Sequence, residues 1–387
     1  MDLTVTTKDL TDHATWASHA SPKRPAAPVL AGMLLTATAD GTLTLTATDY
    51  ETTATAAMDA HVDTVGTALV SARLLATVLA TLPTGGTTTL THDGARLHIT
   101  SGTAKFALAT MDAADYPQMP GMPDPLGQVG AADLAAAVAQ VAPFAATDNT
   151  LPILTGVHLH LGQELTLTAT DRYRVGERTL TWEPTPDTTD GEDREILVDH
   201  RALTLATRGL SGDIQLGATS TDTGHTTNTF GLTDGVRTLL ARPIDGEYPK
   251  IRKLIDRPLH DPATVEVDAA ELLAAVKRTS TVLGRNEPIL LDAADGALTI
   301  RAGAETDQSS DTIDATLTGT PRTLAFNAAY LVDVLTVQRT ERIRLDMPIG
   351  PDNTSGKAGH VIITPVDADD YRVVIVPIRH LTARAAA

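Results

Sequence analysis

The heptapeptide LTLTATD occupies residues 43–49 and recurs, letter for letter, at residues 165–171, 122 positions later. Its Leu and Thr side chains alternate, which places the Leu residues on one face of a strand and the Thr residues on the other. The heptapeptide therefore predicts a half-buried β-strand. In a chain this rich in Ala and Thr such a strand could also recur by chance, so the flanking residues have to decide whether it marks a repeat.

The flanking residues repeat as well. A Pro-x-Leu turn precedes each copy, as PVL at 28–30 and PIL at 152–154, and a Gly follows within two residues. A looser third copy begins with PIL at 288–290 and leads into the alternating stretch ALTI at 297–300. Asp-Gly pairs at 40–41 and 295–296 are hairpin-turn signals. The same unit is therefore written three times.

A helical pattern recurs in steps of 128 residues. LVSARLLATVLATLP begins at Leu69, LVDHRALTLATRGLS at 197 and AFNAAYLVDVLTVQR at 325, and each runs from a strand into an amphipathic helix. Ser71, Asp199 and Asn327 stand where an N-cap belongs, because their side-chain oxygens can accept from the first free amides of the helix.

The ends of the units match too, as ATMDAADYP up to residue 117, ARPIDGEYP up to 249 and VIVPIRH up to 380. An amphipathic helix is expected to open each unit, at roughly residues 8–20, 131–146 and 269–284. The sequence thus predicts three α+β domains, each with two helices and antiparallel sheets, over residues 1–120, 126–255 and 259–387. Residues 120–125 and 256–258 suit linkers, and the acidic insert near residue 187 suits a solvated loop.

The composition bounds the class of protein. The 387-residue chain is 42% apolar but only 3% aromatic, which predicts an aliphatic core. It contains no Cys, which excludes disulfides, thiolate chemistry and Cys-ligated zinc, and fits a reducing compartment. The opening residues MDLTVTTKDL do not resemble a signal peptide, and no apolar run approaches about 18 residues. These features predict a soluble, cytoplasmic protein.

The charge is unevenly distributed. A formal net charge of −18 argues, on average, against a nucleic-acid partner. The six predicted helical segments nevertheless carry +3 together and leave −21 to the rest of the chain; they span residues 8–24, 71–82, 131–147, 199–212, 268–285 and 327–340. If these helices share one surface, it would attract a polyanion loosely, through phosphates and not base edges. A chance shortage of acidic residues in the helices explains the same count.

Over essentially its whole length, the chain resembles the bacterial DNA polymerase III beta subunits, the sliding clamps. The resemblance is carried by the PVLAG and PILTG turns, by ATDY and ATDRYR after the strands, and by FALATMDAADYP, GEYP and VIVPIR. It implies a head-to-tail homodimer, closed into a ring with the helices around duplex DNA and the sheets outside. It also implies a nucleoid-associated, non-catalytic subunit without cofactor or metal. Its expected partners are the DNA polymerase III alpha subunit, the clamp loader and other proteins with a clamp-binding motif.

The resemblance assigns DNA contacts. In the family, cations before the first Pro-x-Leu turn and in the second helix of the first domain touch phosphates, and Arg24 and Arg73 hold those places here. Leu151 departs from the family, which often has a basic residue before this Pro. Further helix cations that could face DNA, or could be ordinary surface residues, are Lys23, Arg201, Arg208, Lys277, Arg278 and Arg339.

The family's partner motif docks in an apolar pocket between the second and third domains, where aliphatic walls and a few polar anchors suit peptide capture. Core packing of the same strands is the competing explanation. The matching residues are Leu154, Thr170, Arg172, Tyr173, Arg174, Val175, Pro249, Lys253, Leu254, Val374, Val376, Pro377, Ile378 and Arg379.

Two departures lie beside this pocket. Arg172 stands where relatives commonly have Gly, and the chain continues after Arg379 as HLTARAAA where relatives usually end. The hypothesis that follows is a variant second clamp that resists a pocket-directed inhibitor, because Arg172 blocks the inhibitor.

The family's dimer contact joins the edge strand and second helix of the first domain to the first helix of the third. The matching residues are Val78, Leu82, Phe106 and Leu108 on one side and Val282 and Leu283 on the other. Core packing competes as an explanation for the two residues of the second helix.

No catalytic constellation such as GxSxG or HExxH is found. GPDNTSGKA at residues 350–358 has five residues between its glycines, not the four of a P-loop, and Ala358 replaces Ser or Thr, so a surface loop is expected. His158 and His160 could form a metal pair, but a third ligand is missing. A DNA-independent protein-binding scaffold and an enzyme acting on an acidic polymer remain as alternative functions.

Overall fold

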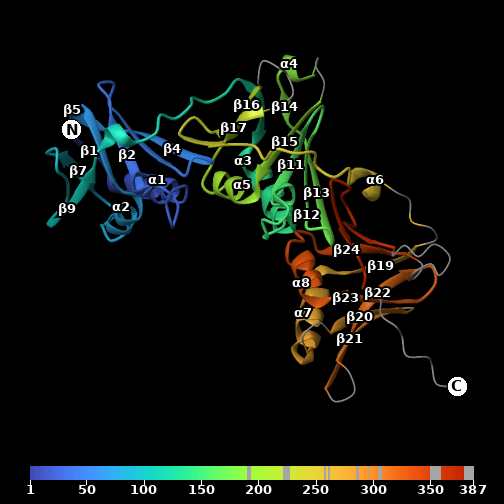
Figure 1. The fold of residues 1–387 in the computed structure, drawn as a ribbon. Coiled ribbons are helices and arrows are strands. Elements are labelled where there is room, and N and C mark those ends of the chain that lie inside the picture. The colour runs from blue at the N-terminus through green and yellow to red at the C-terminus, as the bar shows by residue number, and fades with distance from the viewer. Residues whose placement is uncertain are drawn as a thin grey trace. The chain divides into compact units, whose positions relative to one another are not determined.

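The computed structural model describes residues 1–189, 193–220, 227–256, 259, 262–284, 287–294, 296–303, 307–348 and 359–378. Its internal contacts divide the chain into two compact units (Figure 1). The first comprises residues 1–135, 160–163 and 181–245, and the second residues 136–159, 164–180 and 246–387. The division runs through the second domain. The junction of the first and second domains therefore lies inside the first unit, and the junction of the second and third domains lies inside the second unit.

Each domain opens with a strand. β1 (Asp2–Thr6) precedes α1 (Thr7–Ser18), β10 (Pro125–Gly130) precedes α3 (Ala131–Val141), and β19 (Ala263–Asp268) precedes α7 (Ala269–Thr279). The prediction that a helix opens each unit is therefore wrong, although the helices themselves lie where the periodicity placed them. Leu3 and Val5 are buried in β1, but an alternation this short is easily hidden by the helical pattern that follows it.

The remaining elements follow the predicted order in each domain. The first contains η1 (Pro28–Ala31), β2 (Gly32–Ala37), β3 (Thr42–Thr48), β4 (Thr52–Asp59), β5 (His61–Thr64), β6 (Gly66–Ser71), α2 (Ala72–Leu79), β7 (Thr87–His92), β8 (Arg96–Ser101), β9 (Ala104–Met111) and η2 (Ala113–Asp115). The second contains η3 (Ala142–Phe144), η4 (Pro152–Leu154), β11 (Gly156–Leu161), β12 (Leu165–Thr170), β13 (Arg174–Leu180), β14 (Glu183–Pro184), α4 (Pro186–Thr189), β15 (Arg194–Asp199), α5 (His200–Ala206), β16 (Asp213–Ser220), β17 (Thr227–Thr233) and β18 (Arg237–Ala241). After α6 (Arg252–Ile255), the third contains η5 (Ser280–Val282), β20 (Pro288–Ala294), β21 (Ala297–Gly303), β22 (Gln308–Thr318), β23 (Arg322–Asn327), α8 (Ala328–Thr336), β24 (Arg342–Met347), β25 (Val361–Pro365) and β26 (Tyr371–Ile375).

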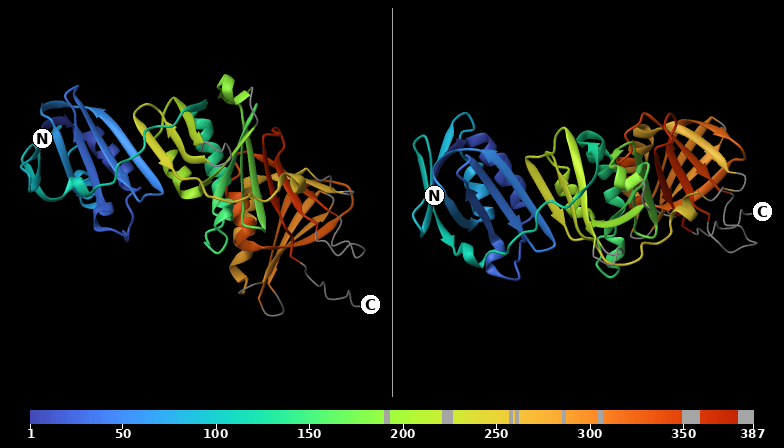
Figure 2. Two further views of the ribbon diagram at one scale, coloured as in Figure 1. Left: turned by 45° about the horizontal axis from the view of Figure 1, so that its top comes forward. Right: turned by 90° about the horizontal axis from the view of Figure 1, so that it is seen from above.

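The second helix of each domain begins at the predicted cap. The side chain of Ser71 accepts from the amide of Leu74 at 3.4 Å. The carboxylate of Asp199 accepts from Arg201 N at 2.8 Å, and the amide oxygen of Asn327 accepts from Ala329 N at 2.9 Å. These bonds confirm the predicted N-caps. α1 packs beside α2, and α7 beside α8, on the sheets of their domains (Figure 2).

The sheets are antiparallel and continue from one domain into the next. In the first unit the strand order is β14-β10-β16-β17-β18-β4-β3-β2-β6-β9-β8-β7-β1-β5. In the second unit it runs, from β11 onward, β11-β12-β13-β26-β25-β24-β19-β22-β21-β20-β23. The pair β18–β4 therefore joins the first two domains, and the pair β13–β26 joins the last two.

The two copies of LTLTATD form equivalent strands with different surroundings. β3 alternates between buried and half-buried residues, as predicted, whereas every residue of β12 is buried. The prediction of a half-buried strand is wrong for the second copy, because other parts of its unit cover the Thr face. The phenol of Tyr248 approaches Thr168 O at 3.5 Å, just as Tyr116 donates to Thr46 O at 3.2 Å. In the first two domains, the repeated Tyr-Pro motif thus places its Tyr hydroxyl against the heptapeptide strand of the same domain.

The acidic insert also differs from its prediction. Residues 186–189 form the short helix α4, and Thr188 is only 2% exposed. Its hydroxyl donates to Leu126 O at 2.8 Å, which ties the insert to β10. The prediction of a solvated loop is therefore wrong for residues 186–189.

The described helices are too short or too polar to cross a membrane.

Candidate functional site

The turn between β12 and β13 is held by side-chain caps. Asp171 Oδ1 accepts from the amides of Tyr173 at 3.0 Å and Arg174 at 2.8 Å. Thr170 Oγ1 accepts from Arg172 N at 3.1 Å and donates to Arg174 O at 2.7 Å. These four bonds fix the backbone of the turn, and they hold Arg172 at a φ of +80°.

The same turn, in which Thr or His precedes Asp, occurs elsewhere in the chain. In two of these turns the residue at the position of Arg172 is Gly. Gly94 (φ +99°) and Gly235 (φ +87°) follow Asp93 and Asp234, whose carboxylates cap their turns in the same way. Tyr50, after the first heptapeptide copy, has a φ of +77°. Because side chains with a Cβ are disfavoured in this region, Arg172 and Tyr50 are strained where the fold suits Gly.

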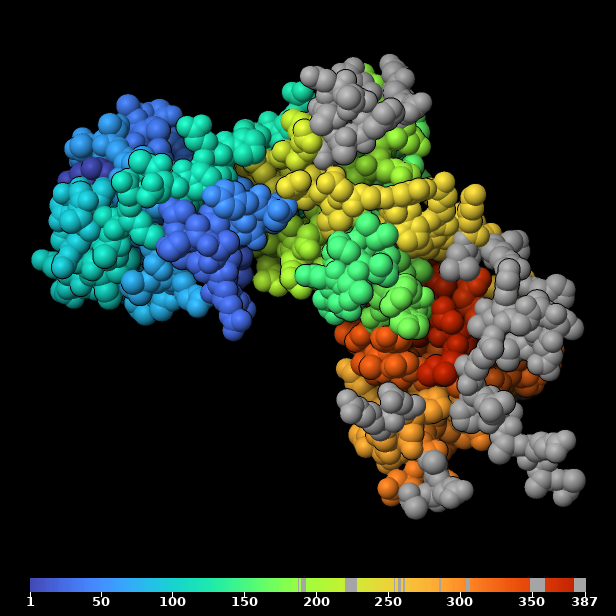
Figure 3. Space-filling view, viewed as in Figure 1, coloured from blue at the N-terminus to red at the C-terminus, as the bar shows by residue number. Residues whose placement is uncertain are grey.

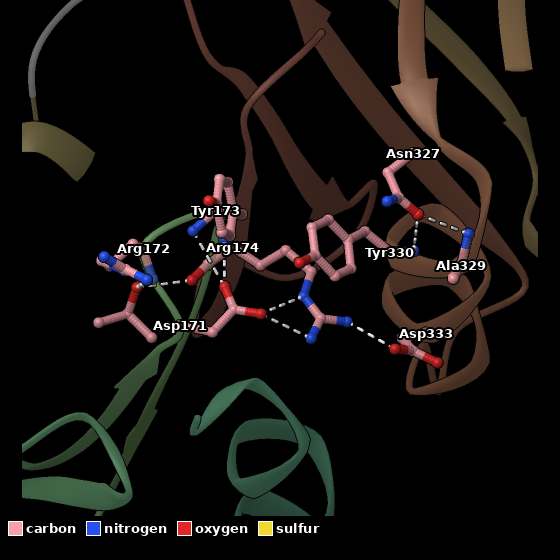
Figure 4. Close-up of polar contacts among 9 residues, drawn as sticks. Asp171, Arg172, Tyr173, Arg174, Asn327, Ala329, Tyr330 and Asp333 are labelled. Atoms are coloured by element: carbon pink, nitrogen blue, oxygen red, sulfur yellow. Dashed lines mark hydrogen bonds and ion pairs between the residues drawn. The ribbon is translucent and has the colours of Figure 1, made fainter. Parts of the chain in front are cut away.

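Arg174 binds the turn to the third domain (Figure 4). Its Nη2 and Nε lie 2.7 and 3.0 Å from Asp171 Oδ2, and its Nη1 lies 2.7 Å from Asp333 Oδ2 on α8. The guanidinium also lies over the ring of Tyr330, 4.4 Å from its centroid. Burial, with the charge of Asp171 as a smaller cause, raises the pKa of Tyr330. A guanidinium this buried needs such partners, since an unpaired charge would be costly.

An aromatic shelf borders the turn. Tyr173 stacks on Tyr330 with ring centroids 5.6 Å apart, and the guanidinium of Arg172 lies 5.9 Å from the ring of Tyr173 (Figure 4). Tyr173 is 50% exposed, Ile378 43% and Leu151 41%. These three are among the few large apolar side chains that the described residues leave exposed. Val376 N donates to Tyr173 O at 3.0 Å, which holds the segment before Ile378 beside the turn.

The floor beside the shelf is apolar. Val175 on β13 pairs in register with Val374 on β26, and both are buried together with Ile255 of α6. Ile251 and Ile362 pack against them and remain partly exposed. The predicted pocket residues thus come together on β13, β26 and the segment around α6.

The structure places the other predicted pocket residues as follows. Leu154 and Thr170 are buried, Val376 and Pro377 are half-buried, and Pro249 and Lys253 are exposed. The side chain of Leu254 and the whole of Arg379 lie outside the described residues. Sequence reasoning missed Tyr330, Asp333, Ile251, Ile255 and Ile362. The only signal for them in the sequence was the i, i+3 spacing of Tyr330 and Asp333 on α8. This spacing does not reveal that both side chains contact Arg174.

A cavity of about 350 Å³ adjoins the floor and is lined by Ile255, Asp256, Leu259, Pro262, Asp346, Ile362 and Arg372. Arg372 Nη2 lies 2.6 Å from Glu177 Oε1 and its Nη1 lies 3.1 Å from Asp256 Oδ1. Burial acts to lower the pKa of Arg372, but the bonds and charges of the two carboxylates outweigh it and raise the pKa. This ion-paired wall is polar, unlike the floor.

The predicted DNA-contact residues are exposed cations. Lys23, Arg24, Arg73, Arg201, Arg208, Lys277 and Arg339 are exposed, and within the described ranges no carboxylate lies within 4.0 Å of them. Arg278 differs, because its Nε and Nη2 lie 2.8 and 2.6 Å from Asp311 on β22. The first set can neutralise phosphates freely, whereas Arg278 is held against the strand.

The predicted dimer residues divide into two groups. Val78, Leu82 and Leu108 are already buried within the described chain, at 8%, 6% and 7% exposure, so core packing accounts for them without a partner. Phe106, Val282 and Leu283 are half-buried. Residues 104–109 of β9 pair with β8 alone among the described strands. Residues 308–314 of β22 likewise pair with β21 alone.

The histidines considered as a metal pair have other neighbours. His160 Nε2 lies 3.2 Å from Asp193 Oδ2, and the ring of His158 stacks on Tyr248 at 4.8 Å. Within the described part of the chain, no three His, Cys, Asp or Glu side chains are placed to hold a metal ion. The segment GPDNTSGKA at residues 350–358 lies outside that part.

The first unit contains a second junction of similar construction. Arg237, the first residue of β18, donates from Nε to His13 Nδ1 at 3.2 Å and from Nη1 to Gly209 O. It also lies over the ring of Trp16, at 5.6 Å, whose Nε1 donates to Leu205 O at 3.1 Å. Burial lowers the pKa of His13, and the charge of Arg237 lowers it further.

Three family models match the chain in tandem. Residues 1–120 match the N-terminal domain of the DNA polymerase III beta subunit, residues 128–250 its central domain and residues 258–379 its C-terminal domain. The chain is 34% identical to the beta sliding clamp of Streptomyces coelicolor over 96% of this chain and 97% of that protein. It is 33% identical to the beta sliding clamp homolog GriR of Streptomyces muensis, over 94% and 95%.

Solved structures share the fold. The DNA polymerase sliding clamp from Bacillus subtilis superposes with a TM-score of 0.86 at 22% identity, over 98% of this chain and 99% of that one. A sliding clamp from Pseudomonas aeruginosa bound to griselimycin superposes with a TM-score of 0.85 at 22% identity, over 98% and 100%.

Proposed function

Because this chain belongs to the DNA polymerase III beta subunit family, the beta sliding clamps of bacteria, we propose that two copies of it close into a ring around duplex DNA. The protein is a DNA sliding clamp, a non-catalytic subunit that tethers the replicative polymerase for processive synthesis. The tandem of three beta-subunit domains carries this function. Dissociation from DNA then requires opening of the ring and not only the loss of a few contacts.

The free strand edges support ring closure. Residues 104–109 of β9 in the first domain and residues 308–314 of β22 in the third lack a neighbour on one side among the described strands. Such edges expose a row of amides and carbonyls that tend to pair with another strand. A head-to-tail dimer that lays the β22 edge of one copy beside the β9 edge of its partner covers both edges at each of two contacts. Phe106, Val282 and Leu283 supply half-buried apolar side chains for that contact.

The exposed helix cations support a loose hold on DNA. Arg24 and Arg73 carry no competing carboxylate within 4.0 Å among the described residues, although the chain carries a net charge of −18. Scattered single cations can neutralise phosphates without reading bases, which permits sliding.

The junction of the second and third domains supports peptide docking. Buried Val175 and Val374 form an apolar floor, and exposed Tyr173 and Ile378 stand at its rim. A short segment of a partner can place apolar side chains on such a floor. The partners are the polymerase alpha subunit, the clamp loader and other proteins that bear a clamp-binding motif, and the site of action is the cytoplasm, on the nucleoid.

The test is topological. The protein would be loaded by a clamp loader onto nicked circular DNA, washed at high salt, and the DNA then linearised. Retention through the wash followed by loss on linearisation is expected. The variant Phe106→Asp puts a charge on the free β9 edge and should abolish retention, whereas Ala95→Asp, in an exposed turn of the same domain, should not. Loss of the wild-type protein in the wash would favour a DNA-independent scaffold.

A second candidate concerns the pocket. Arg172 occupies a strained position that suits Gly, at the rim of the floor, and the chain is 33% identical to the homolog GriR. We propose that this clamp is a variant whose rim obstructs inhibitors aimed at the pocket. The affinity of griselimycin for the wild-type protein and for Arg172→Gly would test it. Tighter binding by the variant is expected, and equal affinities would exclude the idea.

A further inference from the structure

Among the described residues, the arginine at the rim of the docking floor has no carboxylate partner, and we propose that this residue, Arg172, selects peptides that place a carboxylate beside their apolar anchors. This inference rests on the proposed peptide docking and adds the chemistry of the partner. Within the described chain, no carboxylate lies within 4.0 Å of the Arg172 guanidinium.

The neighbouring arginines show how unusual this is. Arg174 pairs with Asp171 at 2.7 Å, Arg178 with Asp370 at 2.7 Å and Arg372 with Glu177 at 2.6 Å. Asp171, Asp370 and Glu177 are therefore already engaged by other guanidiniums. Of these three arginines and Arg172, only Arg172 keeps its full set of side-chain donors for an incoming acceptor.

The nearby acid does not take this role. Asp148 is close enough for the charge of Arg172 to contribute to lowering its pKa, after the hydrogen bonds of Thr150. Its Oδ1 accepts from the amide and the hydroxyl of Thr150 at 2.9 and 2.7 Å, which holds it beyond ion-pair distance from Arg172. Asp148 thus leaves the guanidinium open to a ligand.

The position of Arg172 is fixed by its surroundings. Two bonds from Asp171 and two from Thr170 hold the turn, and Arg174 ties it to Asp333. The Arg172 side chain extends from this turn beside Tyr173, which stacks on Tyr330. A cation whose backbone is held in place loses less entropy on binding than one on a mobile loop, and its planar donors match a carboxylate.

The turn does not need an arginine for its own sake. Tyr50 occupies the equivalent position in the first domain with nearly the same φ, and Gly94 and Gly235 occupy it in two further turns. The backbone therefore accepts other residues, at a lower conformational cost in the case of Gly. A cation in this strained position, next to an apolar floor, suggests that its charge has a use in binding.

The linker helix adds to the positive rim. Arg252 and Lys253 on α6 are exposed, and the described residues place no carboxylate within 4.0 Å of them. The adjacent residues Ile251 and Ile255 pack against the floor. In a chain with a net charge of −18, an apolar floor flanked by unpaired cations attracts a segment that is itself apolar and acidic.

The experiment uses the full chain and a clamp-binding peptide from the replicative polymerase of the same cell. The peptide is made with Asp, Asn or Lys at the residue beside its apolar anchors, and binding is measured by fluorescence anisotropy at low and high salt. The wild-type protein should bind the Asp form about fivefold more tightly than the Asn form and the Lys form most weakly. High salt should narrow the differences.

Two variants decide the cause. Arg172→Gln should bind the Asp and Asn forms equally, whereas Lys250→Gln, an exposed cation already 3.3 Å from Glu247, should keep the wild-type preference. A preference that survives in Arg172→Gln, or is missing in the wild type while the peptides still bind, overturns the proposal and leaves the pocket intact. Failure of all three peptides to bind overturns the docking function as well.

Discussion

At the junction of the first and second domains β18 pairs with β4, and at the junction of the second and third domains β13 pairs with β26. Both pairs are antiparallel, and in both the second domain contributes a strand that begins with an arginine, Arg237 or Arg174. The two junctions nevertheless offer different surfaces. The linkers and the partners of the two arginines account for the difference.

The first linker fills its junction. Residues 117–124 run extended along the surface (Figure 3), and the hydroxyl of Thr53 on β4 lies 3.2 Å from Met119 Sδ. Met122 and Pro123 lie so close to Gly231 on β17 that there is no room for a side chain there. At the second junction, the chain before the linker forms α6, and Ile255 of α6 and the preceding Ile251 border the floor but leave apolar surface at its rim. An equivalent strand pairing therefore yields a docking floor only where the linker does not cover it.

The arginines use different chemistry. Arg237 is held by neutral groups, namely His13, the carbonyl of Gly209 and the ring of Trp16. Arg174 is held by two carboxylates. We therefore expect the second junction to depend more strongly on its arginine, and the first to respond to the protonation of its histidine.

Arg174→Ala should have the largest effect. It leaves Asp171, which is 13% exposed, without its counter-charge and removes the tie to Asp333, so we expect a loss of about 3 kcal/mol of unfolding free energy. Peptide affinity at the rim should fall at least about tenfold, because the turn loses its support. Urea unfolding at fixed protein concentration and anisotropy would measure both. Arg178→Ala, which removes a more exposed pair, should cost about 1 kcal/mol or less, and an equal loss in the two variants would contradict the comparison.

Gly231→Ala should break the packing of the first linker. A methyl group there would meet Met122 Sδ and Pro123 Cδ at 2.6 and 2.8 Å, so we expect a loss of about 1–3 kcal/mol from overpacking. Gly121→Ala, in the same linker, has no atom within 4 Å of the added methyl and should be neutral. Thermal unfolding of the two variants checks this, and a neutral Gly231→Ala would mean that the linker does not pack on β17.

The first junction should be sensitive to acid. His13 has a folded-state pKa below its usual value of 6.5, so its stabilising effect is complete above about pH 6.5 and declines below it as the unfolded chain takes up the proton first. Protonation also removes the Nδ1 acceptor to which Arg237 donates. The charges of Asp9, Asp12 and Asp234 act in the opposite direction, because they favour the protonated imidazole. Unfolding free energies measured across this range should show a steeper acid loss in the wild type than in His13→Gln. Parallel pH profiles would exclude a role for His13.

The smallest expected effect compares the two strained turns. Arg172→Gly and Tyr50→Gly each relieve a positive φ and should each raise the unfolding free energy by up to about 1 kcal/mol. Chemical denaturation of both variants tests this. A gain for Tyr50→Gly alone would show that the Arg172 side chain contributes stability as well as selectivity.

Much of the fold could be read from local patterns. Ser71, Asp199 and Asn327 cap their helices as predicted, because a cap is made by a side chain with amides two or three residues away. The opening strands were missed because five or six residues give too weak a period. The floor residues Val175 and Val374 were identified from the family resemblance, and the structure brings them into register.

The remainder of the site could not be read in this way. Arg174 and Asp333 are 159 residues apart, and nothing near either residue names the other. Arg278, predicted as a helix cation, pairs with Asp311, 33 residues away, and nothing near either residue indicates that pair. Such pairs depend on how whole sheets meet and not on periodicity.

The sequence by itself determined three repeats of one α+β unit, their helix starts and the absence of thiol chemistry, since propensity, capping and composition act over a few residues. The tertiary structure decided which of two equivalent strands lost its exposed face, which junction kept an open apolar floor and which arginines found carboxylates. Those outcomes follow from burial and charge pairing between distant segments, whose free energies exist only once the chain has brought the segments together.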